Sequence, residues 1–234
     1  NAGSITWANN HQTFFYSKKD PATLRNYQIY RHRLGEDPSN DALVYQEDDE
    51  TFQAFVDRSR SDKYLFIVAS HPQWTEYRYL DADTPEGEWT LFQPREKNLI
   101  HWVEHIGDSF VIRTNYQAEN YRMMTCGETA TRKEDWREML PYNPEVFTEG
   151  VIHFKDFTVL QERIEGLSQF RVIDRRDGSD YYIAFDDPTY GIGIGNNPEA
   201  DTDTFRFSYT SFSTPRTVYD YNLEEQSRLE RKQN

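Results

Sequence analysis

An imperfect repeat of about forty-seven residues constrains the fold of this chain more than any other feature of its sequence. An aromatic-arginine pair recurs at Tyr30-Arg31, Tyr77-Arg78, Tyr121-Arg122 and Phe170-Arg171, with spacings of 47, 44 and 49 residues. A fifth, degenerate copy stands at Val218-Tyr219, 48 residues further on. A period of roughly 20 to 50 residues is typical of repeat architectures such as solenoids and propellers. We therefore expect a chain built from five equivalent units.

Each unit contains four short segments with the character of β-strands. In the first unit they are "SITWAN", "TFFYSKK", "YQIYRHR" and "ALVYQE", and turns rich in Asp, Gly, Asn and Pro separate them. Four such strands per unit are typical of a β-propeller blade. We predict an all-β fold, a partial propeller domain over 1–234, with approximate blades at 4–49, 50–98, 99–148, 149–188 and 189–234. The paired aromatic should fill the gap between blades, and its arginine should reach a carboxylate or carbonyl on the opposite face.

The stretch "HWVEH" at residues 101–105 fits the H-x-x-E-H pattern of inverted zinc peptidases. That chemistry requires a helix, on which both histidines share one face. Here the stretch falls on the first strand of the third unit, where His101, Val103 and His105 face one way and Trp102 and Glu104 the other. We interpret the match as a coincidence and expect no metal site.

Composition excludes several classes of partner. The net charge of −14 is unfavourable for binding nucleic acid, which needs a basic face. No run approaches the roughly 18 apolar residues of a membrane span, so we expect no membrane partner.

The single Cys126 excludes an internal disulfide and is most simply a packing residue. It favours a reducing compartment, the cytoplasm, with the periplasm as the alternative. Asn1-Ala2 looks like the remainder of a cleaved purification tag.

Motifs of other enzyme classes are absent. There is no G-x-S-x-G elbow, and the glycines of "YGIGIGNNP" alternate with isoleucine and precede no helix, so a phosphate loop is not indicated and we expect no cofactor. A glycosidase would need two converging carboxylates, for which Asp48, Asp57, Glu104 and Glu149 are candidates. One hypothesis for the function is thus a self-contained five-bladed propeller that acts as a binding module or glycosidase. It is the alternative to the function that the family resemblance implies.

Long ordered stretches resemble one known family. They include "SITWANNHQTFFYSKKDPATLRNYQIYRHRLGEDPSNDALVYQEDDETF", "SRSDKYLFI", "FQPREK", "IAFDDPTY" and "FRFSYTSFSTPRTVYDYNLE". Together they resemble the propeller of the oligopeptidase B (protease II) enzymes of the prolyl oligopeptidase family, over essentially the whole chain. The resemblance implies a serine oligopeptidase that cleaves short peptides after Arg or Lys, with a seven-bladed propeller capping an α/β-hydrolase domain.

The resemblance also implies what this chain does not carry. The catalytic triad of such enzymes lies on the hydrolase domain, so no catalytic residue is assigned here, and the chain alone should hydrolyse nothing. Five units would correspond to the later blades of seven, with the hydrolase domain of the same polypeptide and short basic peptides as partners. Terminal blades without neighbours would expose apolar faces, and we expect such faces to favour dimerisation.

Loops at one end of the blades are expected to face the hydrolase domain or the passing peptide. These loops join the second strand of a blade to the third, or one blade to the next. The interdomain or substrate-facing candidates on them are Arg25, Tyr27, Glu47, Asp48, Glu76 and Arg216.

Overall fold

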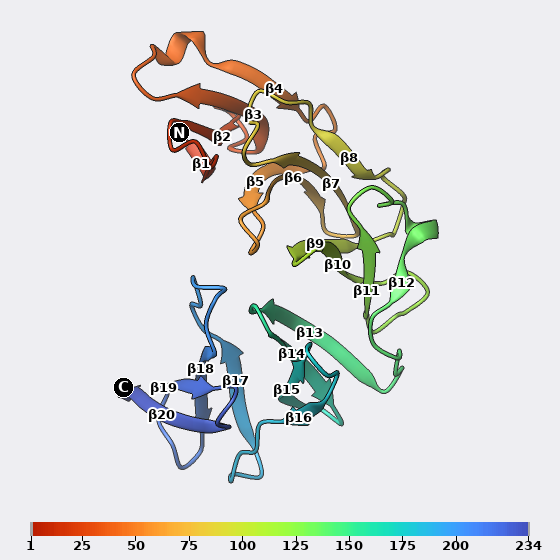
Figure 1. Ribbon diagram of the computed structural model, residues 1–234, viewed down its shortest axis with the longest axis vertical. Coiled ribbons are helices and arrows are strands. Elements are labelled where there is room, and N and C mark those ends of the chain that lie inside the picture. The colour runs from red at the N-terminus through yellow and green to blue at the C-terminus, as the bar shows by residue number, and fades with distance from the viewer. Residues whose placement is uncertain (1, 234) are drawn as a thin grey trace. The chain divides into compact units, whose positions relative to one another are not determined.

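The computed structural model describes residues 2–233 and contains almost only β-strands (Figure 1). It divides into two compact units, unit 1 with residues 1–117 and 123–140 and unit 2 with residues 118–122 and 141–234. Ala2 is the first residue of β1 and pairs with Lys18, whereas Asn1 lies outside the described residues.

Unit 1 contains three sheets, which we call blades 1 to 3, each of four strands that pair in chain order. Two 3-10 helices, η1 (Pro38–Asn40) and η2 (Lys133–Asp135), precede the last strands of blades 1 and 3. The strands are β1 (Ala2–Trp7), β2 (Thr13–Lys19), β3 (Asn26–Arg33), β4 (Ala42–Gln46), β5 (Gln53–Arg58), β6 (Tyr64–His71), β7 (Trp74–Asp81), β8 (Thr90–Gln93), β9 (His101–Ile106), β10 (Ser109–Thr114), β11 (Arg122–Gly127) and β12 (Arg137–Glu138).

Unit 2 contains two further sheets of the same kind, blades 4 and 5. The expected interval 149–188 for the fourth unit begins inside β13, which starts three residues earlier, at Val146. The strands are β13 (Val146–His153), β14 (Phe157–Ile164), β15 (Leu167–Asp174), β16 (Asp180–Tyr182), β17 (Tyr190–Ile194), β18 (Thr204–Ser211), β19 (Thr217–Asn222) and β20 (Ser227–Gln233).

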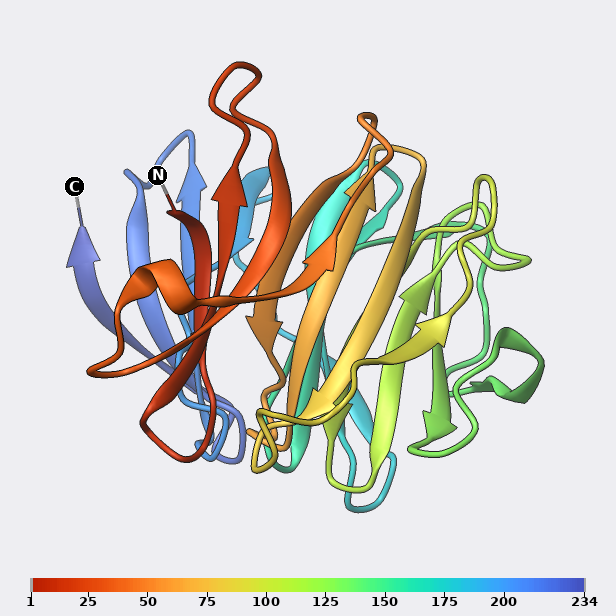
Figure 2. The same cartoon turned by 90° about the horizontal axis from the view of Figure 1, so that it is seen from above.

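Within unit 1 the sheets of neighbouring blades stand face to face (Figure 2). The core lies between facing blades, as expected for units that bury apolar area by stacking. Phe15 and Ile29 of blade 1 pack with Leu65 and Ile67 of blade 2. The other face of blade 2 packs on blade 3, and in unit 2 blade 4 packs on blade 5. Alternation of side chains along its strands gives blade 2, which lies between blades 1 and 3, two apolar faces. The predicted all-β class and the four strands in each unit are confirmed.

The aromatic-arginine pairs follow the prediction in some blades only. Tyr77 and Phe170 are buried between blades, in the clusters that join blade 2 to blade 3 and blade 4 to blade 5. The expectation is wrong for Tyr30, which stacks on Tyr16 with ring centroids 5.7 Å apart, while the preceding Ile29 enters the core. Neighbouring residues of a strand point to opposite faces, and the pairing of β3 with β4 is irregular at these two residues.

Arg31, Arg78 and Arg171 reach oxygen atoms, as predicted for the arginines of the pairs. Arg31 Nη1 donates to the carbonyl oxygen of Pro85 at 3.0 Å, which ties blade 1 to the β7–β8 loop of blade 2. Arg171 pairs with the carboxylate of Asp180. Each of these two contacts gives a guanidinium group an oxygen atom as hydrogen-bond acceptor.

The stretch His101–His105 lies on a strand, β9, as predicted, and its histidines and Val103 are buried. Trp102 on the other side is partly exposed, with its ring under the Arg113 guanidinium at 3.9 Å. Within residues 2–233 no three His, Cys, Asp or Glu side chains are grouped so that they could hold a metal ion. In the same range no helix is long and apolar enough to cross a membrane.

Candidate functional site

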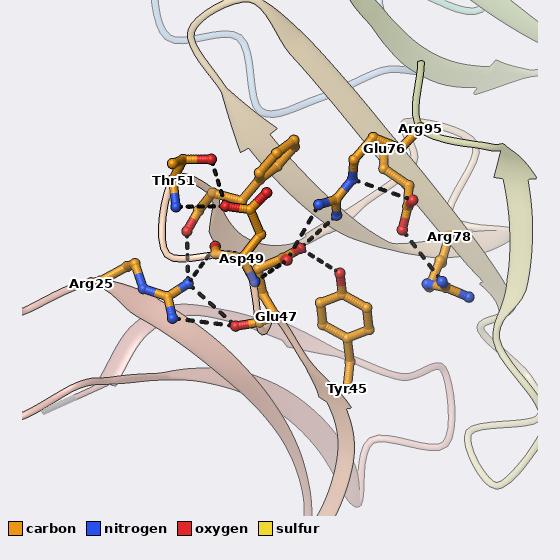
Figure 3. Close-up of polar contacts among 9 residues, drawn as sticks. Arg25, Tyr45, Glu47, Asp49, Thr51, Glu76, Arg78 and Arg95 are labelled. Atoms are coloured by element: carbon orange, nitrogen blue, oxygen red, sulfur yellow. Dashed lines mark hydrogen bonds and ion pairs between the residues drawn. The ribbon is translucent and has the colours of Figure 1, made fainter. Parts of the chain in front are cut away.

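Four of the six candidate residues meet at one end of blades 1 and 2 in unit 1. Figure 3 shows Arg25, Glu47 and Glu76, and the ring of Tyr27 lies beside the Arg25 guanidinium. Arg25 ends the β2–β3 connection, and Tyr27 lies on β3. Glu47 follows β4, and Glu76 lies on β7. We call this group the rim cluster. It also contains Tyr45, Arg78 and Arg95, which the sequence did not single out as candidates.

The β2–β3 turn that carries Arg25 is fixed by its own first residue. The Asp20 carboxylate accepts hydrogen bonds from the backbone N–H groups of Ala22 and Thr23, at 2.9 and 2.7 Å. These bonds lower the pKa of Asp20, so it remains ionised. A short acidic side chain that closes such a turn is a common device in loops.

Arg25 clamps the loop between β4 and β5. Its Nη1 donates to the carbonyl oxygens of Phe52 at 2.9 Å, Asp49 at 3.1 Å and Glu47 at 3.3 Å. The guanidinium lies 5.4 Å from the centre of the Tyr27 ring. A planar group with five donors can hold several carbonyls at once, which lysine could not do in the same geometry. Arg25 therefore fixes the backbone of residues 47–52.

Glu47 is the most buried carboxylate of the rim cluster, with 4% of its surface exposed. Its Oε2 accepts from Arg95 Nη2 at 2.6 Å and from the Tyr45 hydroxyl at 2.8 Å. Its Oε1 accepts from the Asp49 backbone N–H at 3.0 Å. Burial raises the pKa of Tyr45, and the hydrogen bond to Glu47 raises it further. Tyr45 thus stays protonated and serves as a donor.

Arg95 joins two carboxylates and an aromatic ring. Besides Glu47 it faces Glu76, with 3.6 Å between Nε and Oε2, and it lies 3.6 Å above the centre of the Phe52 ring. Burial alone would lower the pKa of Arg95, but its bonds to Glu47 and Glu76 raise it. The far oxygen of Glu76 pairs with Arg78 at 3.3 Å. Charges of opposite sign thus alternate through the rim cluster.

The alternating positive and negative charges determine what the rim cluster can do chemically. Glu47 and Glu76 are neutralised by Arg95 and Arg78, and we see no nucleophile with a general base among these residues. The cluster holds the ends of two blades together and fixes the shape of the loop between them. It is a positioning device.

The loop that Arg25 holds presents three consecutive exposed acids, Asp48, Asp49 and Glu50. Asp48 accepts from the Gln46 side-chain amide at 2.8 Å. Asp49 accepts from the Thr51 hydroxyl at 2.6 Å and from its N–H at 2.9 Å, and these bonds lower the pKa of Asp49. A rigid, negatively charged edge is complementary to a basic group on a partner.

The remaining candidates lie elsewhere. Arg216 is exposed in the β18–β19 loop of unit 2. Of the four acids considered for a glycosidase, Asp57 and Glu104 interact electrostatically within unit 1, and burial raises the pKa of Glu104 to about 7. Glu149, in unit 2, is held by Arg163, Gln161 and Ser168. Asp48 lies in the loop that follows β4 in unit 1.

Cys126 is a packing residue, as interpreted from the sequence. It is buried in the cluster between blades 2 and 3, beside Met124 and Trp136. Burial raises the pKa of its thiol to about 12, so the reactive thiolate does not form near neutral pH.

Comparison with known proteins decides the family. The whole chain, residues 1–234, matches the model described as the prolyl oligopeptidase N-terminal β-propeller domain. The chain belongs to this family. The propeller domain is similar to solved structures of oligopeptidase B. The structure from Trypanosoma brucei gives a TM-score of 0.90 at 27% identity, over 99% of this chain and 34% of that one. The one from Leishmania major gives 0.89 at 25% identity, over 99% and 34%.

Curated relatives of the propeller domain are peptidases by name. It is 38% identical to dipeptidyl aminopeptidase BI of Pseudoxanthomonas mexicana over 231 residues, 98% of this chain and 32% of the relative. It is 30% identical to protease 2 of Moraxella lacunata over 222 residues, 95% and 31% respectively. The chain thus spans about one third of the length of these relatives.

Of the residues that the sequence analysis did not single out, Tyr45 and Arg78 lie on strands β4 and β7, and Arg95 lies in a loop. Arg95 lies in "FQPREK", one of the stretches that carry the family resemblance, and in the loop between β8 and β9. That resemblance was the available signal. The partner of Arg95, forty-eight positions earlier in the chain, could be identified only from the fold.

Proposed function

We propose that this propeller domain is the non-catalytic part of a serine oligopeptidase that cleaves short peptides after Arg or Lys. The observation that carries the proposal is the overlay of almost the whole chain on oligopeptidase B at TM-scores of 0.89 and 0.90. In this proposal the propeller limits entry by size and packs on a hydrolase domain of the same polypeptide. The chemistry then belongs to that domain.

The rim cluster supports a role in contact with that domain or with substrate. Its loop is held by Arg25 at three carbonyls and presents Asp48, Asp49 and Glu50 outward. A rigid acidic edge attracts basic peptides at little cost in ordering. Because Glu47 and Glu76 are already paired with arginines, the three exposed acids are the groups that remain for such contacts.

A second candidate comes from the relative named as a dipeptidyl aminopeptidase, at 38% identity. Such an enzyme would require a free amino terminus two residues before the scissile bond. The propeller would then bound a pocket for that terminus. The two candidates differ in substrate, so one experiment separates them.

The test uses the natural polypeptide that contains this chain, purified from its source, with the chain alone as the control. We expect it to hydrolyse amino-blocked chromogenic amides of Arg or Lys, and the chain alone to hydrolyse none of these amides. Hydrolysis of substrates with a free dipeptidyl amino terminus, and not of the blocked ones, would favour the second candidate. No hydrolysis of either would contradict both.

The proposal also covers location and assembly. It places the enzyme in the cytoplasm, with the periplasm as the alternative, because the sequence has one cysteine.

Blade 1 exposes 57% of Ile5 and 40% of Trp7 on β1, and we propose that this face supports dimerisation of the isolated chain. Light scattering of the chain across a concentration series tests this, and a mass of 27.9 kDa at every concentration would contradict it.

A further inference from the structure

A second group of polar side chains lies in unit 1 at the end of blade 2 opposite the rim cluster. Ser61 is in the turn between β5 and β6, His105 is on β9, and Glu128 follows β11. The turn exposes Ser61, whereas His105 is fully buried. This group is separate from every residue considered above for function, except that His105 belongs to the HWVEH stretch.

The three side chains form a hydrogen-bonded chain. Ser61 Oγ lies 2.7 Å from His105 Nδ1, and His105 Nε2 lies 2.8 Å from Glu128 Oε1. Lys63 Nζ also bonds Glu128 Oε1, at 2.5 Å. These bonds, with that of Lys63 as the largest influence, lower the pKa of Glu128, which is therefore ionised near neutral pH. A serine, an imidazole and a carboxylate in this order are the elements of nucleophilic catalysis.

The carboxylate determines which ring nitrogen carries the proton. An ionised carboxylate only accepts hydrogen bonds, so Nε2 carries the hydrogen and Nδ1 has a free lone pair. The Ser61 hydroxyl must therefore donate to Nδ1. Burial lowers the pKa of His105, which keeps the ring neutral near pH 7, so that Nδ1 can accept a proton. The rings of Tyr64 and Phe110, at 4.8 and 5.0 Å, hold the imidazole in this orientation.

Other groups are placed to stabilise negative charge on the Ser61 oxygen. The backbone N–H of Lys63 donates to Oγ at 3.3 Å. The hydroxyl of Ser59 lies 3.0 Å from the same atom, and it accepts from the Tyr64 N–H at 2.9 Å, so its own proton can point to Ser61. Donors aimed at an oxygen before charge develops lower the barrier to forming the alkoxide.

We propose that Ser61 is an activated serine that accepts an acyl group from small activated esters, with His105 as general base and Glu128 as a positioning residue. In this step Ser61 Oγ attacks the carbonyl carbon while its proton moves to His105 Nδ1. The bond from that carbon to the leaving oxygen breaks, and the leaving oxygen takes the proton from Nδ1. A fluorophosphonate reacts in the same way at phosphorus, and fluoride leaves with the proton.

The chain contains a control serine, Ser213, which resembles Ser61 in its surroundings but has a carboxylate where Ser61 has His105. Ser213 lies in the exposed β18–β19 turn, 3.0 Å from the hydroxyl of Ser211, as Ser61 lies beside Ser59. Its hydroxyl donates to Asp187 Oδ1 at 2.8 Å. Ser213 therefore shares the exposure and the neighbouring hydroxyl of Ser61, but its partner is a carboxylate.

The test treats the natural polypeptide with a fluorophosphonate and measures adduct formation at each serine by mass spectrometry. Chymotryptic cleavage places Ser61 in the peptide 56–64 and Ser213 in the peptide 213–219, so other reactive serines of the polypeptide do not interfere. We expect Ser61 to react about 100-fold faster than Ser213, the lower range for general-base assistance. Equal rates at the two serines would overturn the proposal.

Two variants complete the experiment. Ser61→Ala should remove the adduct from peptide 56–64 and leave the rate at Ser213 unchanged. Glu128→Gln keeps the size of the side chain but replaces a carboxylate, which only accepts hydrogen bonds, by an amide that can also donate. The His105 imidazole then loses its fixed tautomer, and labelling of Ser61 should slow about 10-fold or more. Labelling of Ser61 in Glu128→Gln at the rate of the unmodified protein would also overturn the proposal.

Discussion

Arg95 Nη2 lies 2.6 Å from Glu47 Oε2 and thereby connects the loop after blade 2 to the loop after blade 1. Glu47 is nearly inaccessible to solvent, and the Arg95 side chain is about one quarter exposed. The partly buried pair thus fixes the ends of two blades that also share an apolar core.

Glu47→Gln should destabilise the protein strongly. The change leaves Arg95 without its main counter-charge in a partly desolvated site, and breaking such a pair costs about 3 kcal/mol. Urea unfolding measures the free energy directly. The control is Lys155→Ala, which breaks an exposed pair with Asp201 and should leave the unfolding midpoint unchanged. A loss below about 1 kcal/mol for Glu47→Gln would show that the pair has a minor structural role.

Arg25→Ala should loosen the loop 47–52 without unfolding the blades. Three carbonyl contacts are lost together, while the sheet pairing of β4 and β5 does not depend on them. Hydrogen exchange should show the amides of Asp49 and Phe52 opening about 10-fold faster, which corresponds to about 1.4 kcal/mol. Unchanged exchange at these two amides would refute the role of Arg25 as a clamp.

His101 should make the protein less stable in acid. Burial lowers the pKa of His101 to about 3 in the folded state, from an ordinary value of 6.5. Below pH 6.5 the unfolded chain binds a proton that the folded chain does not, so this contribution to stability is lost as the pH falls toward 3. The slope is about 1.4 kcal/mol per pH unit, and His101→Phe should remove it. The same slope in the variant would contradict the assignment.

Glu104 should have the opposite effect on stability over an overlapping pH range. Burial raises the pKa of Glu104 to about 7 in the folded state, from an ordinary value of 4.5, and Asp57 adds to the shift. Between pH 4.5 and 7 the folded chain binds more protons than the unfolded chain, so stability contributed by this group falls as the pH rises through that window. The difference in unfolding free energy between Glu104→Gln and the unmodified protein isolates this effect from that of His101. A difference that does not vary between pH 4.5 and 7 would rule it out.

The sequence was sufficient to predict the architecture because the fold is made of repeated local patterns. Alternation along His101–His105 identified a strand and excluded the zinc motif, and four strand-like segments per repeat identified the blade. The face on which Tyr30 lies could not be predicted, because an irregular pairing between β3 and β4 changes which residue enters the core. Local alternation does not encode such an irregularity.

The candidate site was predictable only in part, for a related reason. Loops that carry Arg25 and Glu47 could be located from strand order alone. Their partners could not, because Arg95 meets Glu47 across a blade interface, and Ser61, His105 and Glu128 come from three separate segments. Contacts of this kind depend on how twisted sheets stack, and single-sequence patterns do not specify it.

The most direct test of the central claim is the cleavage of one Arg-containing sequence presented in two lengths to the natural polypeptide that contains this chain. One substrate is a short peptide, and the other is a long unfolded polypeptide with the same site. If the propeller limits entry by size, the short peptide is cleaved after Arg and the long one is left intact. Equal cleavage of both would contradict the claim that this propeller gates the active site.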